Sequence, residues 1–228
     1  MIGDLGNTRA GHMATAVTKI FGIGLNKTGT TTLGVCFQAL GFKHLGFRRD
    51  LLKAYKRGDI ASVLEVVDLY DSFEDWPYPL LYRELFERYG KTARFILTTR
   101  ASPQIWLDSL KAHSLRTNPL SHSDRLVYGY DYPHGYEAEH IAFYERHNSA
   151  VRAFFAGQGG PDVLLDVCWE LGHGWKELCA FLAVPTPALP FPHAYRGETL
   201  TPDPKFLQIN QRNIAAQLAA LERRRAKP

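Results

Sequence analysis

The stretch Gly24-Leu25-Asn26-Lys27-Thr28-Gly29-Thr30-Thr31-Thr32 decides how this chain folds. It follows the apolar run 19–23 and precedes residues 31–40, whose pattern is typical of a helix. The order strand, glycine-rich turn, helix is therefore predicted. Such a turn directs backbone N–H groups and a helix N-terminus at an anion, which is how many proteins hold phosphate.

The loop departs from the usual nucleotide-binding pattern at one position. Gly24 and Gly29 keep the frame of Gly-x-x-x-x-Gly-Lys-Ser/Thr, but Thr30 stands where the lysine is expected. The lysine lies inside the loop instead, at Lys27. Because the usual lysine reaches the β- and γ-phosphates of a triphosphate, this loop is not expected to hold one. A plain turn with a solvated lysine is the alternative.

The pattern Lys27-x-Gly29-Thr30-Thr31 after a strand resembles the 5′-phosphosulfate loop of sulfotransferases that use 3′-phosphoadenosine-5′-phosphosulfate (PAPS), above all their small soluble P-loop branch. The resemblance implies the product adenosine 3′,5′-bisphosphate, a hydroxyl or amine acceptor on a small molecule, and no metal. It also implies a catalytic role for Lys27, which stabilises charge on the leaving phosphate. The residues it assigns to the 5′-phosphosulfate are Asn26, Lys27, Thr28, Gly29, Thr30, Thr31 and Thr32.

A second segment resembles the same family. Residues 93–99 are predicted to form a buried strand that ends at Arg100, and a helix begins with Pro103 in its first turn. Ligands of open α/β sheets bind at the carboxyl ends of the strands, so Arg100 should face the same crevice as the loop. In the family an arginine here and a serine about eight residues later bind the 3′-phosphate. Ser109 is nine residues on, which places the extra residue in the turn before the helix.

The alternatives for these two residues are structural. Arg100 would otherwise form a surface ion pair, and Ser109 would be an ordinary helix serine.

A third segment, Phe73-Glu74-Asp75-Trp76-Pro77, offers a candidate base. The family often places its catalytic base in such a strand-to-helix turn, two residues before a proline, and cytosolic members have histidine there. Asp75 matches that position and would accept the acceptor's proton, the more readily if burial raises its pKa. The alternative, equally weighted, is that Asp75 caps the following helix. Weaker base candidates are Asp71, Glu74, His44 and His113.

Two later segments complete the resemblance, which spans residues 19–197. Residues 164–170 match a late family strand after which the chain reaches the adenine, so Trp169 is expected to stack on it. The pair Arg196-Gly197 occupies the place of the loop that closes over the 3′-phosphate.

The composition is that of one globular domain. The 228 residues are 45% hydrophobic and 22% charged, and the net charge of +4 suits an anionic ligand but is too small for a nucleic-acid footprint. Residues 1–12 resemble an expression tag, which leaves residues 13–228 as the domain. There is no apolar run of membrane-spanning length and no signal peptide, and the three cysteines follow no disulfide or metal pattern. A cytoplasmic protein with buried free thiols is expected.

Alternating strand and helix patterns predict an α/β fold: a three-layer, P-loop-type domain with a mainly parallel central sheet flanked by helices. The predicted strands are 19–24, 42–45, 69–72, 93–99 and 163–167. The predicted helices are 30–40, 49–57, 60–67, 78–89, 103–114, 136–155, 174–183 and about 204–225. Residues 117–135 show no periodicity and are expected to form a lid or substrate loop. The last helix should dock on the domain's own core, with a homodimer contact as the less favoured alternative.

Two other functions remain open from the sequence alone. One is a P-loop kinase or NTPase using Mg-ATP, in which Asp68, Asp71 or Asp166 would serve as the metal-binding acid. The other is a non-catalytic nucleotide-binding module, which follows if Asp75 only caps a helix.

Overall fold

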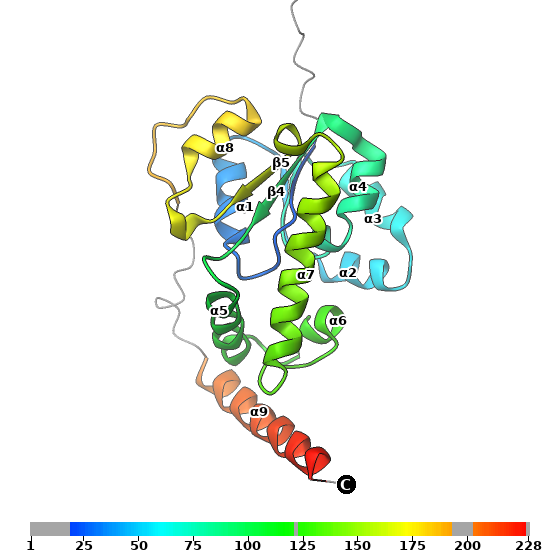
Figure 1. The fold of residues 1–228 in the computed structure, drawn as a ribbon, viewed down its shortest axis with the longest axis vertical. Helices are drawn as coiled ribbons and strands as arrows, with labels where there is room; N and C mark the ends of the chain where they lie inside the picture. Colours follow the sequence, from blue (N-terminus) through cyan, green and yellow to red (C-terminus); the bar gives the residue numbers. More distant parts are fainter. Residues whose placement is uncertain (1–18, 121–122, 193–202, 227–228) are drawn as a thin grey trace, which may run out of the picture.

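The computed structural model describes residues 19–120, 123–192 and 203–226 (Figure 1). Their five strands form one parallel sheet in the order β2-β3-β1-β4-β5. The strands are β1 (Lys19–Gly22), β2 (His44–Leu45), β3 (Ser72–Phe73), β4 (Ala93–Thr98) and β5 (Leu164–Val167). The order puts β1 at the centre, and the loop that follows β1 therefore opens at the middle of the sheet's carboxyl edge.

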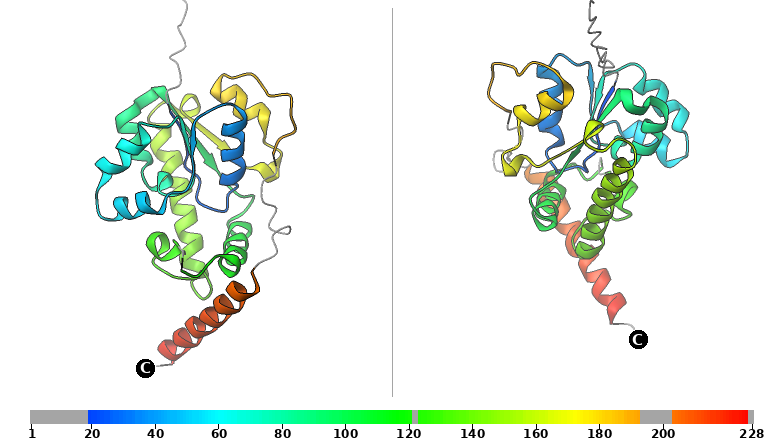
Figure 2. Two further views of the ribbon diagram at one scale, coloured as in Figure 1. Left: turned by 180° about the vertical axis from the view of Figure 1, so that it is seen from behind. Right: turned by 45° about the horizontal axis from the view of Figure 1, so that its top comes forward.

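Helices cover both faces of the sheet, as the three-layer prediction requires (Figures 1 and 2). On one face lie α1 (Thr30–Ala39) and α8 (Trp175–Leu182). The other face is covered by α2 (Arg49–Lys56), α3 (Ile60–Val67), α4 (Tyr82–Tyr89) and α7 (Glu137–Ala156). Short 3₁₀ turns lie between these elements: η1 (Tyr78–Leu80), η2 (Gly90–Thr92), η3 (Gly160–Asp162) and η4 (Trp169–Leu171).

The two faces of the sheet have separate apolar cores because side chains alternate along each strand. In β1, Ile20 packs with α1 and α8, whereas Phe21 packs with α4 and α7. Phe21 pairs in register with Phe73 and Phe95, and its ring stacks on both, at 5.0 and 5.3 Å between centroids. This aromatic row fixes the central strands side by side and so fixes the loop that leaves β1.

A third apolar cluster lies beyond the carboxyl ends of the strands. It joins the loop residue Leu25 to α5 (Pro103–Arg116), α6 (Asp124–Tyr128) and α7, with Trp76 and Trp106 at its centre. The Trp106 indole donates to the Asn26 carbonyl oxygen at 2.9 Å. A packed cluster of helices therefore lies beyond the carboxyl edge of the sheet.

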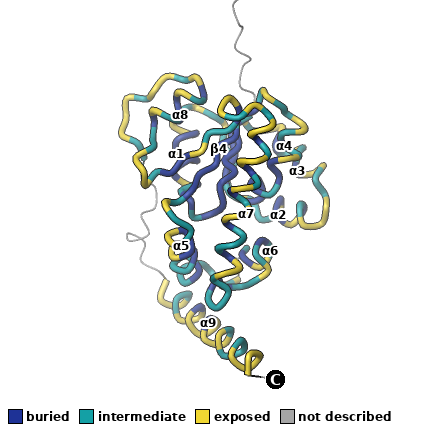
Figure 3. The backbone as a smooth tube through the Cα atoms, in the orientation of Figure 1, coloured by how far each residue is buried: buried dark blue, intermediate teal, exposed yellow. Residues whose placement is uncertain are grey.

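The helix α9 (Pro204–Arg225) packs against α5 and projects beyond the rest of the molecule, largely exposed (Figure 3). Its fully buried Asn210 donates to the carbonyl oxygens of Leu115 and Thr117 and accepts from the Tyr132 hydroxyl at 2.8 Å. Gln217 donates to the Tyr132 and His134 carbonyl oxygens. The helix thus packs on its own chain, as predicted, but it does so against α5 and largely through polar side chains, and its Ile209 and Leu218 are exposed.

Most predicted elements are present, with three local errors. The predicted strand 69–72 is displaced, because β3 spans Ser72–Phe73 and Leu69 lies in the turn after α3. The predicted helix 78–89 is interrupted at Leu81, between η1 and α4. Residues 117–135, predicted to be without regular structure, contain the one-turn helix α6. The predicted buried free thiols are confirmed: Cys36, Cys168 and Cys179 are all free and buried. Within the described ranges no helix has the length and apolarity needed to cross a membrane.

Gly24 is predicted to tolerate no side chain. A Cβ there would lie 2.3 Å from the Thr98 carbonyl oxygen and 2.1 Å from its Oγ1, and backbone of a central strand cannot move aside cheaply. We expect Gly24→Ala to cost at least about 2 kcal/mol of unfolding free energy. The matched control is Gly157→Ala, whose φ is −82° and whose new Cβ would have only an ordinary contact at 3.7 Å. Denaturant unfolding of both variants checks this, and equal stabilities would refute the close approach.

Candidate active site

The loop between β1 and α1 has a strained backbone conformation that sets its shape. Lys27 has a φ of +66° and Gly29 of +91°, both in the left-handed region. Gly29 is the N-cap of α1, and because glycine has no side chain, the helix begins with backbone N–H groups rather than a capping oxygen. The predicted strand, turn and helix are thus present in the predicted order, and the loop has the form expected of an anion site.

The hydroxyl of Thr28 holds the loop from inside. Thr28 is 1% exposed, and its Oγ1 donates to the Leu25 carbonyl oxygen at 2.6 Å and contacts the Thr98 Oγ1 at 2.6 Å. The Thr28 backbone N–H also points back to Leu25, at 3.3 Å. Because both donors of Thr28 are engaged, this residue shapes the loop and clamps it to β4. Among its predicted partners in phosphate binding, Thr30 and Thr32 are buried and Thr31 is exposed.

Lys27 lies at the centre of a cluster of charged side chains. Burial lowers the pKa of its amine, and so do Arg116 and Arg100, whereas Asp75 and Asp124 raise it. These residues come from the loop, the end of β3, the end of β4, α5 and α6. The topology therefore brings Lys27, Arg100 and Asp75, three residues predicted from separate motifs, into electrostatic contact.

Arg100 connects the loop to the end of the sheet. One terminal nitrogen donates to the Lys27 carbonyl oxygen at 3.3 Å, and the other pairs with Glu170 at 2.6 Å. The second Glu170 oxygen accepts from the Ala101 N–H at 2.8 Å. The ion-pair alternative predicted for Arg100 is therefore present, and the same guanidinium lies beside the loop.

The turn after β3 presents Asp75. It has a φ of +65°, and its Oδ1 accepts from the adjacent Trp76 N–H at 2.7 Å. The turn η1 begins from the Asp75 backbone oxygen, which accepts from Tyr78, rather than from the carboxylate. The capping alternative is therefore wrong in the form in which it was predicted.

The environment of Asp75 suits a proton acceptor. Burial raises the pKa of its carboxyl to about 7, aided by the neighbouring carboxylate of Glu74, while the Trp76 N–H and Lys27 act in the opposite direction. Glu74 is itself buried, and within the described chain its Oε2 has no hydrogen-bond partner. The raised pKa means that a substantial part of the Asp75 carboxyl retains its proton near neutral pH.

Four residues that shape the site were not predicted: Thr98 and Glu170, described above, and Asp124 and Tyr128. Asp124, in the unpredicted helix α6, is 7% exposed and acts electrostatically on both Lys27 and Asp75. Tyr128, at the other end of α6, donates to the Asn26 Oδ1 at 2.7 Å. In the sequence, Asp124 and Tyr128 stand four positions apart in a segment without periodicity. That spacing alone does not identify a helix.

The remaining predicted residues are less closely tied to the loop. Ser109 is half-buried on α5, whose unbroken run from Pro103 places the extra residue before the helix, as expected. The Trp169 indole donates to the Gly29 carbonyl oxygen at 3.2 Å and packs on Phe191, so it covers the edge of the loop. Arg196 and Gly197 lie outside the described residues.

Of the four weaker base candidates, Glu74 is the neighbour of Asp75, and the other three have partners of their own. His44 Nδ1 contacts the buried Ser72 hydroxyl at 3.1 Å, and its Nε2 lies 3.9 Å from Glu74. Asp71 is exposed and accepts from the Lys43 N–H, and His113 contacts Thr117 on α5.

A comparison with known protein families agrees with this arrangement. The family model described as "Sulfotransferase domain" matches residues 19–128 and 120–200. The chain belongs to this sulfotransferase domain family. A relative from Aspergillus versicolor, "Ava biosynthesis cluster protein M", is 26% identical over 215 residues, which cover 77% of this chain and 80% of the relative. The matched region contains the loop, the Asp75 turn, Arg100 and Trp169.

Glu74→Gln should lower the pKa of Asp75. The substitution removes the nearest like charge and keeps the side-chain shape, so the Asp75 titration midpoint should fall below its value of about 7. Carboxyl ¹³C chemical shifts followed against pH measure this directly. Asp124→Asn is the control and should lower the midpoint less, since Asp124 contributes less to the shift. An unchanged midpoint in Glu74→Gln would contradict the coupling.

The same shift has a consequence for stability. The folded-state pKa of Asp75 lies above its unfolded value, so the folded protein binds the proton more tightly. The contribution of this proton to the free energy of unfolding is fully present below about pH 4 and is lost as the pH rises through about 7. The unfolding free energy of the wild type relative to Asp75→Asn should therefore decrease across that interval.

Proposed function

We propose that this protein is a PAPS-dependent sulfotransferase that transfers the sulfuryl group to a hydroxyl or amine of a small-molecule acceptor. The observation that supports this best is the convergence of Lys27, Arg100 and Asp75 at the carboxyl edge of the sheet. A phosphate-type loop, a separate arginine and a carboxyl with a pKa near 7 are the groups such a transfer needs. Family membership supports the sulfotransferase class, while the donor and the acceptor are our proposal.

The residues fit a nucleotide with phosphates at both the 5′ and 3′ positions. The N-terminus of α1, together with Lys27 of the preceding loop, would hold the 5′ end, and Arg100 would hold the 3′-phosphate. Within the described residues the buried Nε of Arg100 has no hydrogen-bond partner, so this guanidinium has a donor to offer beside the loop. Glu170 balances its charge until an anion takes that place. Trp169 covers the edge of the loop where the family reaches the adenine.

Each residue has a separate task in the proposed reaction. When bound, PAPS supplies the sulfuryl group. Lys27 neutralises charge on the phosphate side. In the free protein, burial first of all, and then the charges of Arg116 and Arg100, lower the pKa of its amine. Asp75 takes the proton of the acceptor hydroxyl, since a carboxyl with a pKa of about 7 is a competent base at neutral pH. Asp124 adds negative charge near both groups.

The kinase alternative finds less support. Asp68 and Asp71 precede β3, at the edge of the sheet opposite the loop, and Asp68 is bound by Arg88 and Tyr89. Asp166 pairs with Arg152 of α7. We therefore expect adenosine 3′,5′-bisphosphate to raise the melting temperature more than Mg-ATP does. A hundredfold excess over the dissociation constant corresponds to about 2.7 kcal/mol, a readable shift. A larger shift with Mg-ATP would favour the kinase.

Arg100→Ala should weaken adenosine 3′,5′-bisphosphate far more than adenosine 5′-monophosphate. Charge-assisted hydrogen bonds to a phosphate are worth about 1.5–3 kcal/mol, or roughly 10- to 150-fold in affinity, and only the bisphosphate has the 3′ group. Titration calorimetry with both nucleotides measures the difference. Arg152→Ala, which breaks the exposed pair with Asp166, is the matched control and should bind both normally. Equal losses for the two nucleotides would assign Arg100 a structural role only.

Asp75→Asn should lower turnover by about 100-fold or more, because the amide keeps the side-chain shape but cannot take a proton. PAPS with 2-naphthol as the acceptor provides the assay, and the affinity for adenosine 3′,5′-bisphosphate should be unchanged. The control is Asp71→Asn, an exposed carboxyl at the other edge of the sheet. Normal turnover in Asp75→Asn would remove it as the base.

A further inference from the structure

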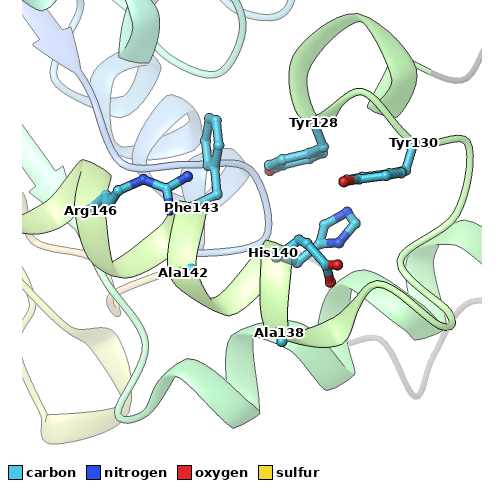
Figure 4. Close-up of a pocket in the computed structure, with 8 residues that line it drawn as sticks. Tyr128, Tyr130, Ala138, His140, Ala142, Phe143 and Arg146 are labelled. Atoms are coloured by element: carbon cyan, nitrogen blue, oxygen red, sulfur yellow. The ribbon is translucent and has the colours of Figure 1, made fainter.

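A pocket of about 470 Å³ lies beside the candidate active site, between the end of α6 and the outer side of α7 (Figure 4). Its walls are mostly aromatic. The lining residues are Tyr128, Tyr130, Ala138, Glu139, His140, Ala142, Phe143 and Arg146. None of them belongs to the loop or to the predicted catalytic residues.

The rings that line this pocket are tilted against one another. The His140 ring lies against two tyrosines, with its centroid 5.0 Å from Tyr128 and 5.7 Å from Tyr130 (Figure 4). Phe143 packs edge-on against Tyr128 at 5.1 Å, and Tyr130 stacks on Tyr136 at 3.7 Å. Aromatic walls of this kind favour an aromatic ring, which packs on them by offset or edge contacts.

His140 supplies the pocket with a polar atom that lacks a hydrogen-bond partner in the described chain. The residue is 1% exposed, and its Nδ1 contacts the Tyr136 carbonyl oxygen at 2.7 Å, so Nδ1 carries the proton and donates. Nε2 is then an acceptor, and it has no partner in the described chain. Burial lowers the pKa of the imidazole, which favours its neutral form with Nε2 unprotonated, and Nε2 itself is buried at the pocket wall. A buried acceptor without a donor costs about 1–3 kcal/mol, which a hydroxyl group on a ligand would recover.

Tyr128 connects this pocket to the loop. Its ring lines the pocket, while its hydroxyl donates to the Asn26 Oδ1 at 2.7 Å. Burial and the charges of Asp124 and Asp75 raise the pKa of that hydroxyl, which places it within the electrostatic reach of the candidate base. A ring packed along Tyr128 therefore has one edge at His140 and the other toward the loop.

The rim of the pocket carries no net charge. Glu139 and Arg146 are both exposed and lie on the same helix, so a ligand meets one carboxylate and one guanidinium there. This balance favours an uncharged ligand over an acid or an amine.

We propose that this pocket is the acceptor site, and that the acceptor is an uncharged aromatic molecule with two hydroxyl groups at opposite edges. One hydroxyl donates to His140 Nε2, and the other lies toward the Asn26 loop, where it is sulfated. This inference rests on the proposed sulfotransferase function for the second hydroxyl, but the binding of the ring and the first hydroxyl does not depend on it.

The test compares two probes that differ by one hydroxyl, 2,7-dihydroxynaphthalene and 2-naphthol, by titration calorimetry. The wild type should bind the diol about tenfold more tightly, the value of one additional hydrogen bond of about 1.4 kcal/mol. His140→Phe should abolish the preference, and His140→Gln, which keeps an acceptor oxygen, should restore part of it. Tyr130→Leu should weaken both probes equally, since it removes a wall but not the acceptor.

Adenosine 3′,5′-bisphosphate binding is measured on the same variants and should be unaffected, which shows that they are folded. The pocket assignment is overturned if the wild type binds neither probe, shows no preference for the diol, or keeps that preference in His140→Phe. Probe binding that depends on His140 without any nucleotide binding would instead leave the pocket in place and remove the proposed function.

Discussion

The contact between Thr28 and Thr98 is the constraint on which the rest of the site depends. It joins the loop after β1 to the neighbouring strand β4 by a buried 2.6 Å hydrogen bond, and Gly24 closes the same gap from the other side. Because β4 continues directly into Arg100, one clamp fixes the loop and the arginine in a single rigid unit. The distance between the two proposed phosphate positions is thus set by strand pairing rather than by flexible side chains, which reduces the entropy lost on binding.

The site carries costs that the remainder of the fold offsets. Among the described residues, three non-glycine residues have a positive φ, and two of them are Lys27 and Asp75. Conformations of this kind cost about 1–3 kcal/mol each and persist where the surroundings enforce them. Burial also lowers the pKa of Lys27 and raises that of Asp75, so the charged form of each side chain is less stable than it is in water. A bound anion beside Lys27 would raise the pKa of its amine again, so that part of the cost of burying this charge in the free protein becomes affinity for the ligand.

The sequence predicted those parts of the molecule that depend on local patterns. The strands β1, β4 and β5 appear as short apolar runs, and α9 has caps and length enough to be recognised. The proximity of Lys27, Asp75 and Arg100 could be predicted, because each follows a strand and resembles a sulfotransferase motif. Glu170, Asp124 and Tyr128 could not, since each acts through a partner 69 or more positions away or through a five-residue helix too short to show a period. The hydrogen bond between Thr98 and Thr28 could not be predicted for the same reason, because its partners are 70 positions apart. Within its strand, Thr98 looks like any other buried residue.

The most direct test is a crystal structure with adenosine 3′,5′-bisphosphate bound. We predict the 5′-phosphate at the N-terminus of α1 beside Lys27, and the 3′-phosphate on Arg100, with Glu170 displaced from its 2.6 Å ion pair. Thr28 should keep its contacts with Leu25 and Thr98. A nucleotide bound elsewhere, or one bound in the loop with Arg100 still paired to Glu170 and the 3′-phosphate in solvent, would contradict it.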